Sequence, residues 1–366
     1  MRTLLVFCAL AAVPLPVGAE RYGAAGVNGA FLTRAASPRA SGLAGAFTAV
    51  ADDASAVVAN PGGLGQIRSF EAVAMRDAMV GAGRFRDDLG VTFVAAALPL
   101  GPGVGGVAVT AMDWGTYERR DAWGAAVGPV AATDVAVAAS WAAVNPGWFG
   151  RAGWSGIAVE TVREASGRFL LGFSGGSVIP IASAGRVGWA LEHVGLAADG
   201  SALPALFKLG ASLAEARAPF PLRLSLDVAY PFVQGRFWIG AGAEASPFTT
   251  VRVRLGYRWR AGGDGLTGPT GVAAGAGVRL GSYGLDWAWQ PFGDLVTAHR
   301  IAVTYAFLPA PKTVRRETVP DLGVERAPAA PPPAGPASAD EPASRPDAGS
   351  AMVERTRPSG AEDRSA

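Results

Sequence analysis

The stretch "VRVRLGYRWR", residues 251 to 260, alternates strictly between two kinds of side chain. Its odd-numbered residues, from Val251 to Trp259, are all apolar, and its even-numbered residues are four arginines and one glycine. Because successive side chains of a β-strand point to opposite faces, this segment has one apolar and one charged face. The pattern predicts a strand that separates a nonpolar environment from a polar one.

The same alternation recurs over most of the chain. In "LRLSLDVAY", residues 222 to 230, apolar side chains alternate with Arg223, Ser225 and Asp227. We count about 14 such segments between Ser69 and Phe307, with lengths near the 9 to 11 residues of a tilted membrane-crossing strand. The sequence therefore predicts an all-β fold, a closed antiparallel transmembrane β-barrel of about 14 strands. A secreted β-sandwich or propeller also alternates, but its outward face would be polar.

The overall composition points the same way. The chain has 50 glycines, 10 tryptophans and only 17% charged residues, with a mean hydropathy of +0.25, which is unusual for a soluble globular protein. Residues 89–112 are apolar enough for a membrane helix, but prolines and glycines at 99–106 would break it. We expect two strands there, joined by the turn "LGPG".

Both ends of the chain differ from the alternating body. Residues 1–19 carry Arg2, an apolar run and a small-residue cleavage site before Glu20, which predicts a secretory signal peptide. The only cysteine, Cys8, lies within it, so no disulfide is expected. Residues 308–366 are Pro-rich with mixed charge, which predicts a disordered periplasmic tail, either a contact for a partner or a silent extension. The predicted plan is a signal peptide (1–19), a hatch or plug segment (20–68), the barrel (69–307) and the tail (308–366).

Chemical motifs are weak in this sequence. "GPGVGG" has GxGxxG spacing but precedes a predicted strand, whereas a dinucleotide-binding loop must open a helix. Ser174 lies in a GxSxG frame with Asp286 and His299 following, yet no helix follows the serine. There are two histidines, no cysteine pair and no long basic run. We therefore expect no enzyme activity, no catalytic residue, no cofactor, no metal and no nucleic-acid partner.

Two terminal blocks carry a family resemblance. The block "SGLAGAFTAVADDASAVVANPGGLGQI" (41–67) and the ending "PFGDL...HRI" (291–295 and 299–301) resemble the PorV/PorQ family, relatives of the FadL-type barrels. The strand that ends at Phe307 resembles the signal by which outer-membrane barrels are recognised for insertion. The resemblance implies a bacterial outer-membrane location, with the barrel assembly machinery and outer-membrane lipid as partners. It implies transport of hydrophobic small molecules, or an accessory or shuttle role with a secretion-machinery partner or cargo. A structural barrel without either role is the remaining alternative.

The resemblance also implies that residues 24–67 form a hatch that enters the barrel before the first strand. From the residues themselves, we expect a short helix within 45–63 that ends at Asn60-Pro61, with Gly62 and Gly63 adopting positive φ. Gly62 stands where the family pattern has alanine, a change expected to leave the turn intact. The candidate hatch residues are Asp52, Asp53, Asn60, Pro61, Gly62 and Gly63, and the candidate lumen-facing residues are Arg223, Asp227, Arg252, Arg254 and Arg258.

The paired acids Asp52 and Asp53 allow three readings. They can form an ion-pair network with Arg252, Arg254 and Arg258 that holds the plug, they can cap a turn or helix, or they can bind a metal, for which a third ligand is missing. Loop lengths add an orientation. The short turns are expected at the periplasmic end, and mostly longer loops, such as 113–133, at the other end.

Overall fold

The computed structural model describes residues 28–81, 89–148, 151–197, 202–215, 219–263 and 265–307. The barrel and the segment inside it belong to one compact unit, and a second unit, Asp321–Ala366, lies outside the described residues. The predicted signal peptide and tail also lie outside them.

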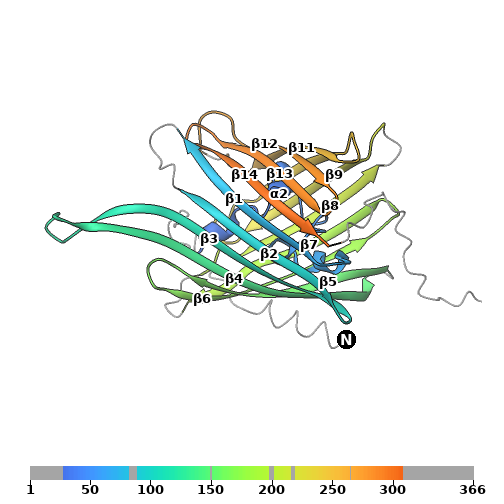
Figure 1. Cartoon of the computed structure of the whole chain (residues 1–366), viewed down its shortest axis with the longest axis horizontal. Coiled ribbons are helices and arrows are strands. Elements are labelled where there is room, and N and C mark those ends of the chain that lie inside the picture. The colour runs from blue at the N-terminus through green and yellow to red at the C-terminus, as the bar shows by residue number, and fades with distance from the viewer. Residues whose placement is uncertain are drawn as a thin grey trace, which may run out of the picture. The chain divides into compact units, whose positions relative to one another are not determined.

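Fourteen antiparallel strands form one closed barrel (Figure 1). Each strand pairs with its neighbours in the chain, and β1 pairs with β14 from Glu71↔Ala306 to Gly81↔Val296, which closes the sheet. The predicted fold and strand number are confirmed. The strands are β1 Glu71–Gly81, β2 Gly90–Leu100, β3 Gly103–Arg120, β4 Ala126–Trp148, β5 Arg151–Arg163, β6 Phe169–Pro180, β7 Gly185–Ala197, β8 Leu206–Glu215, β9 Leu222–Pro231, β10 Trp238–Ala245, β11 Val251–Arg260, β12 Val272–Leu280, β13 Tyr283–Phe292 and β14 Val296–Ala306.

The two faces of the strands follow the sequence alternation. In β11, Leu255 is 67% exposed on the outside while Arg254 is 1% exposed on the inside. An apolar outer surface around a charged interior is the arrangement that lipid requires, and it excludes the sandwich and the propeller. Strand β1 is different, because Val73, Met75 and Met79 face inward and are buried. No helix within the described ranges is long and apolar enough to span a membrane.

The two ends of the barrel differ. At one end lie the turns β2–β3, β6–β7, β10–β11 and β12–β13, and there the chain enters β1 and leaves β14. We call this end the short-turn end and the opposite one the long-turn end. The apolar segment 89–112 forms β2 and the start of β3 around the turn at 101–102, as predicted.

The segment 113–133, expected as a long loop, is instead a strand hairpin. Strand β3 continues to Arg120 and β4 begins at Ala126, with pairs such as Tyr117↔Val130. Strand β2 stops pairing at Gly90↔Asp113 and β5 at Val135↔Arg163, so the hairpin projects beyond both neighbours (Figure 1). The loop prediction was wrong because the pairing continues past a bulge after Asp113, which interrupts the alternation in the sequence.

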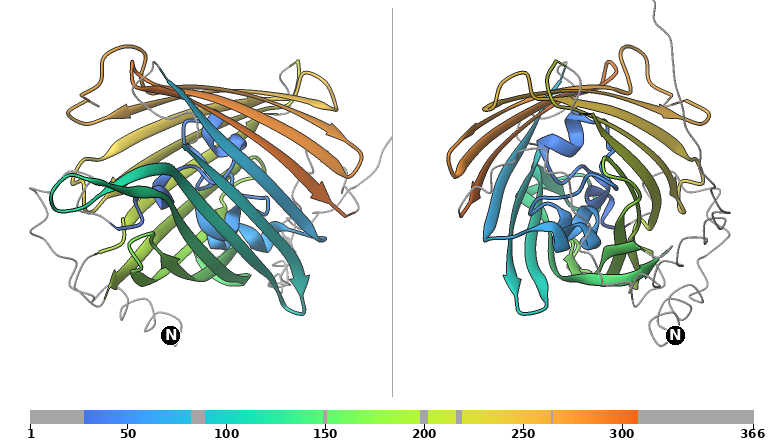
Figure 2. Two further views of the ribbon diagram at one scale, coloured as in Figure 1. Left: turned by 60° about the vertical axis from the view of Figure 1, so that its left-hand side comes forward. Right: turned by 90° about the vertical axis from the view of Figure 1, so that its right-hand side faces the viewer.

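The hatch, residues 28–68, lies inside the ring of strands (Figure 2). It contains η2 Ala30–Thr33, α2 Pro38–Gly42, α3 Ala56–Ala59 and η3 Pro61–Gln66. A helix does end at Asn60-Pro61, but it has only four residues, and most of 45–55 is turns. The expected positive φ at Gly62 and Gly63 is wrong, since positive φ occurs at Ala44 (53°) and Gly45 (87°).

Candidate functional site

The hatch runs through the lumen from one end of the barrel to the other. At the long-turn end, the backbone N–H of Gly29 donates to Oε1 of Glu164 in the β5–β6 turn at 2.9 Å. At the short-turn end, η3 leads into β1, and Phe307 donates its N–H to the carbonyl of Phe70. The lumen is therefore filled along its length by this chain's own N-terminal part (Figure 2).

The barrel wall carries glycines, which have no side chain, where the hatch contacts it. Eight strands present an inward glycine whose missing Cβ would lie against atoms of the hatch. At Gly156, a Cβ would lie 2.5 Å from the carbonyl carbon and oxygen of Pro61. At Gly156, Gly188, Gly210, Gly242 and Gly256 the close atoms include hatch backbone, so the hatch packs directly on the wall there and leaves no room for a methyl group. We call these residues the glycine seat: Gly106, Gly156, Gly176, Gly188, Gly210, Gly242, Gly256 and Gly275.

The motif Asn60-Pro61-Gly62-Gly63 fits into this seat. The Asn60 side-chain amide donates to the carbonyls of Thr48 and Ser177, at 2.8 and 3.2 Å. A Cβ on Gly62 would lie 2.6 Å from the carbonyl oxygen of Gly176, and one on Gly63 would lie 2.2 Å from the carbonyl oxygen of Ala51. These glycines are needed for close approach rather than for positive φ, so glycine at 62 is not interchangeable with alanine.

Asp227 faces the lumen, as the alternation of β9 indicated. Its Oδ2 accepts three hydrogen bonds from the hatch, from the N–H groups of Phe47 (3.0 Å) and Thr48 (2.9 Å) and from the Thr48 hydroxyl (2.6 Å). Its Oδ1 is buried without a hydrogen-bond partner in the described part of the chain. A buried carboxylate that accepts several N–H groups holds a turn firmly, because each of these bonds is charge-assisted.

The paired acids meet Arg39 of the hatch itself. Arg39 forms ion pairs with Asp52, with Asp53 at 3.2 Å and with Glu244 of β10 at 2.9 Å. Burial alone would lower the pKa of the Arg39 guanidinium, but the carboxylates of Asp52, Glu244 and Asp53 raise it well above its usual value. Arg223 contributes a second cation, with Nη1 3.3 Å from Asp52.

Asp52 and Asp53 thus form ion pairs, but with Arg39, Arg186 and Arg223 rather than with the expected Arg252, Arg254 and Arg258. Asp53 also accepts from the N–H and hydroxyl of Ser55 through Oδ1, which is a turn-capping contact. The expected cation partners differ from those found, since Arg254 pairs with Glu244 and Asp286, each at 2.7 Å. In the described part of the chain, no three His, Cys, Asp or Glu side chains gather in a group that could hold a metal ion.

The other two predicted arginines also lie on the lumen side. Arg258 donates through Nε to the carbonyl of Ala44 at 3.0 Å and lies 4.3 Å from the ring centre of Trp238. Arg252 is half-buried and makes no hydrogen bond or ion pair with the residues that the structure describes. Of the predicted lumen residues, Arg223, Asp227 and Arg258 contact the hatch directly, and Arg254 reaches it through Glu244 and Arg39.

A second polar contact was missed by the sequence reasoning. Asp77 of β1 is fully buried, and its Oδ2 accepts from Arg34 of the hatch and, at 3.1 Å, from Arg300 of β14. Arg300 also donates to the Ser41 hydroxyl at 2.7 Å. A single acid in the largely apolar inward face of β1 was the available signal, and no neighbouring pattern identified its partners.

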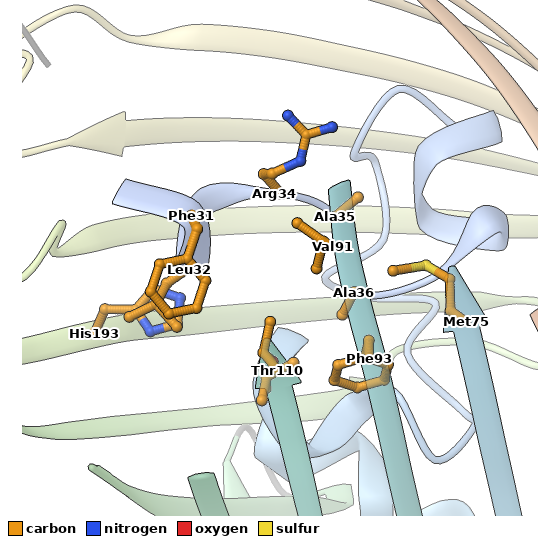
Figure 3. A pocket seen from close by; sticks show the side chains of 11 residues that line it. Phe31, Leu32, Arg34, Ala35, Ala36, Met75, Val91, Phe93, Thr110 and His193 are labelled. Carbon is orange, nitrogen blue, oxygen red and sulfur yellow. The ribbon is translucent and has the colours of Figure 1, made fainter. Parts of the chain in front are cut away.

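Above the glycine seat, toward the long-turn end, the lumen keeps a cavity. Its volume is about 330 Å³ when the part open to solvent is counted. Figure 3 shows how hatch residues line it together with side chains of the wall strands. Three of its lining residues are polar or charged, namely Arg34, Thr110 and His193. The others are apolar: Phe31, Leu32, Ala35, Ala36, Val58, Met75, Val91 and Phe93.

His193 enters this cavity because of a bulge. Strands β6 and β7 lose register between Phe173 and Gly175, and His193 has a φ of 56°, so it points inward together with Glu192. Its Nδ1 lies 2.8 Å from Oε1 of Glu160. The sequence suggested only an ordinary strand histidine, because a bulge leaves no pattern in the sequence.

The hydrolase motif is not assembled. The Ser174 hydroxyl accepts from the backbone N–H of His193. Asp286 pairs with Arg254, and His299 stacks on Trp287 with ring centres 6.2 Å apart. The three motif residues thus have separate partners.

The sequence matches no protein-family model and no curated protein. Among solved structures, the chain is similar to the CymD monoaromatic hydrocarbon channel, with a TM-score of 0.51 and 12% identity over 75% of this chain and 98% of that one. A Pseudomonas aeruginosa FadL homologue gives 0.45 and 12% identity over 74% and 98%. Acinetobacter baumannii outer membrane protein Omp33 gives 0.42 and 7% identity over 66% and 100%. At 12% identity, the likeness to CymD shows a shared barrel fold.

Proposed function

We propose that this protein is a non-enzymatic barrel of the bacterial outer membrane that transports small hydrophobic molecules. The observation that carries the proposal is the apolar cavity between the hatch and strands β1–β3, inside a closed barrel with an apolar outer surface. The space in it that the centre of a water molecule can occupy is about 20 Å³, so the hatch must shift before a small hydrophobic molecule fits there. The fold that the chain shares with a monoaromatic hydrocarbon channel supports the same proposal.

Uptake of a radiolabelled monoaromatic compound such as toluene tests this function. Cells that carry the protein should accumulate the label faster than cells without it. Thr110→Trp should abolish the difference, because Thr110 lines the cavity. Val109→Trp is the matched control, since Val109 is the next residue of β3 and is 44% exposed on the outside. Equal uptake by cells that carry the unchanged protein, Thr110→Trp or Val109→Trp, with barrels of normal heat-modifiability, would reject the proposal.

An accessory role in protein secretion, as in the PorV/PorQ family, is the second candidate. The glycine seat favours it, because direct backbone packing suits a permanent seal. In this role the barrel would bind a partner or cargo, with a periplasmic tail at residues 308–366 as a contact. Deleting residues 309–366 should then leave barrel assembly intact and abolish co-purification of the partner from gently solubilised outer membranes. Unchanged co-purification would exclude the role for the tail.

A further inference from the structure

Four arginines lie along the wall at the short-turn end of the lumen. Each is one residue in from that end of its strand, and each lies on the inward-facing side of the alternation. We call them the arginine arc: Arg186 of β7, Arg223 of β9, Arg252 of β11 and Arg279 of β12.

The hatch and wall acids do not neutralise the arc. Arg223 and Arg186 share Asp52, at 3.3 and 3.8 Å, and Asp52 is also bound by Arg39. Arg279 shares Asp286 with Arg254, at 3.3 and 2.7 Å. Through these described ion pairs, and with Arg252 added, six arginines share the four acids Asp52, Asp53, Glu244 and Asp286.

Some donors of this group remain unused. Arg252 has no ion pair or hydrogen bond among the described residues, although Arg39, Glu244 and Arg279 lie within electrostatic range of it. Nη2 of Arg254 is buried without a hydrogen-bond partner in the described part of the chain. The arginines of the arc are not sealed off, since the side chains of Arg186, Arg223 and Arg279 are 14%, 23% and 22% exposed. Partly exposed cations in a low-dielectric mouth attract anions strongly.

The width of the arc selects the kind of anion. From β7 to β12 there are five strand spacings of about 4.8 Å, so the arc covers about 24 Å of wall. A single phosphate or carboxylate spans one or two guanidinium groups, whereas an extended peptide of about seven residues, at about 3.3 Å per residue, spans the whole arc. Arg186, Arg223 and Arg252 are on alternate strands about 10 Å apart, which matches acids on every third residue of such a peptide, and Arg279 is on the strand next to Arg252, about 5 Å away.

We propose that the arginine arc binds an acidic segment of a polypeptide that approaches the short-turn end of the barrel. The carboxylates pair with Arg186, Arg223, Arg252 and Arg279, and Arg252 supplies a guanidinium that has no hydrogen bond or ion pair among the described residues. This binding does not rest on the proposed passage of small hydrophobic molecules, so uptake and peptide binding can fail separately.

The test uses the full-length protein in detergent and a fluorescein-labelled peptide with glutamate at every third residue, (Glu-Gly-Ser)4. The same peptide with glutamine in place of glutamate is the reference. Fluorescence anisotropy should show binding of the acidic peptide only, and the binding should weaken as salt rises. Arg252→Gln should weaken it by about fivefold to tenfold, since no ion pair or hydrogen bond among the described residues occupies this guanidinium.

Arg120→Gln is the matched control, because Arg120 lies on the projecting hairpin and its contacts, with Glu118 and with the carbonyl of Gly124, are exposed. Arg252 has no described partner to lose, so Arg252→Gln should fold normally, and heat-modifiability checks this. Equal affinity of Arg252→Gln and the unchanged protein would overturn the proposal. So would full displacement of the peptide by millimolar phosphate, which indicates a small-oxyanion site, or by vesicles with anionic phospholipid, which indicates a lipid site.

Discussion

The glycine seat makes a quantitative prediction at Gly156. In Gly156→Ala, the new methyl carbon would lie 2.5 Å from the carbonyl carbon and oxygen of Pro61 and 2.8 Å from the nitrogen of Gly62, all backbone atoms of the hatch. Backbone cannot rotate away as a side-chain end does, so the hatch must move off the wall. Overpacking of a filled interior costs about 1–3 kcal/mol.

This cost destabilises the state in which the hatch packs on the wall, and it does not affect the state in which the hatch is displaced. A shift of about 1–3 kcal/mol raises the ratio of displaced to seated hatch by roughly 5-fold to 150-fold, since about 1.4 kcal/mol corresponds to a factor of ten. The assay is the single-barrel conductance in planar bilayers, together with the sensitivity of intact cells to a bulky antibiotic such as vancomycin. We expect more frequent open events and greater sensitivity in Gly156→Ala.

Gly175→Ala provides the matched control on the adjoining strand. A Cβ at Gly175 has only one neighbour within 4 Å, the carbonyl oxygen of Gly156 at 3.7 Å, and the backbone there has no positive φ. This variant should behave like the unchanged protein. If Gly156→Ala and Gly175→Ala both keep the conductance of the unchanged protein, the idea that the seat holds the hatch is refuted. If both variants leak more than the unchanged protein, and to the same extent, the leak arises from the barrel wall instead.

Three further predictions concern single contacts of the hatch. Replacing Asp52 and Asp53 together with alanine removes the ion pairs of Arg39 and Arg223 and should raise permeability to bulky antibiotics, whereas unchanged permeability would remove the ion-pair role. Asp227→Ala loses three hydrogen bonds to Phe47 and Thr48, which should lower the free energy of unfolding by about 3 kcal/mol. When samples are heated before electrophoresis, the folded band should therefore disappear at a lower temperature, and Ser225→Ala, on the same face of β9, is the control. Phe31→Ala empties a buried side chain next to the cavity, should cost about 3–5 kcal/mol and should increase the amount of toluene that the purified protein retains, measured by native mass spectrometry; retention no greater than before would contradict it.

The sequence predicted the barrel well because the physics of a barrel wall is periodic. A lipid-facing side chain alternates with a lumen-facing one, so Leu255 and Arg254 could be assigned to opposite faces without knowing any contact. The same argument placed Asp227 in the lumen. It failed on β1, where Met75 and Met79 face inward because the hatch and the cavity make that part of the lumen apolar.

The candidate site was predicted less completely, because its contacts join residues far apart in the chain. Asp77 meets Arg34 and Arg300 from three separate segments, and no local pattern encodes such a meeting. The glycine seat was missed for a related reason, since the strand glycines looked like ordinary small residues until the hatch backbone was seen against them. The bulge that turns His193 inward likewise breaks the alternation on which the prediction depended.

The distribution of contacts along the hatch decides which part of it can move first. The part near the long-turn end is held mainly by the Arg34–Asp77 ion pair and by burial of Phe31, and burying one such side chain contributes about 2–3 kcal/mol. The middle part buries Phe47, Val57 and Leu64 against the wall at about 1.5–3 kcal/mol each and adds the three bonds to Asp227. Displacing residues 28–36 therefore costs less free energy than unseating residues 40–64. A molecule that enters the cavity shifts the outer part first, while the glycine seat keeps the rest of the hatch on the wall.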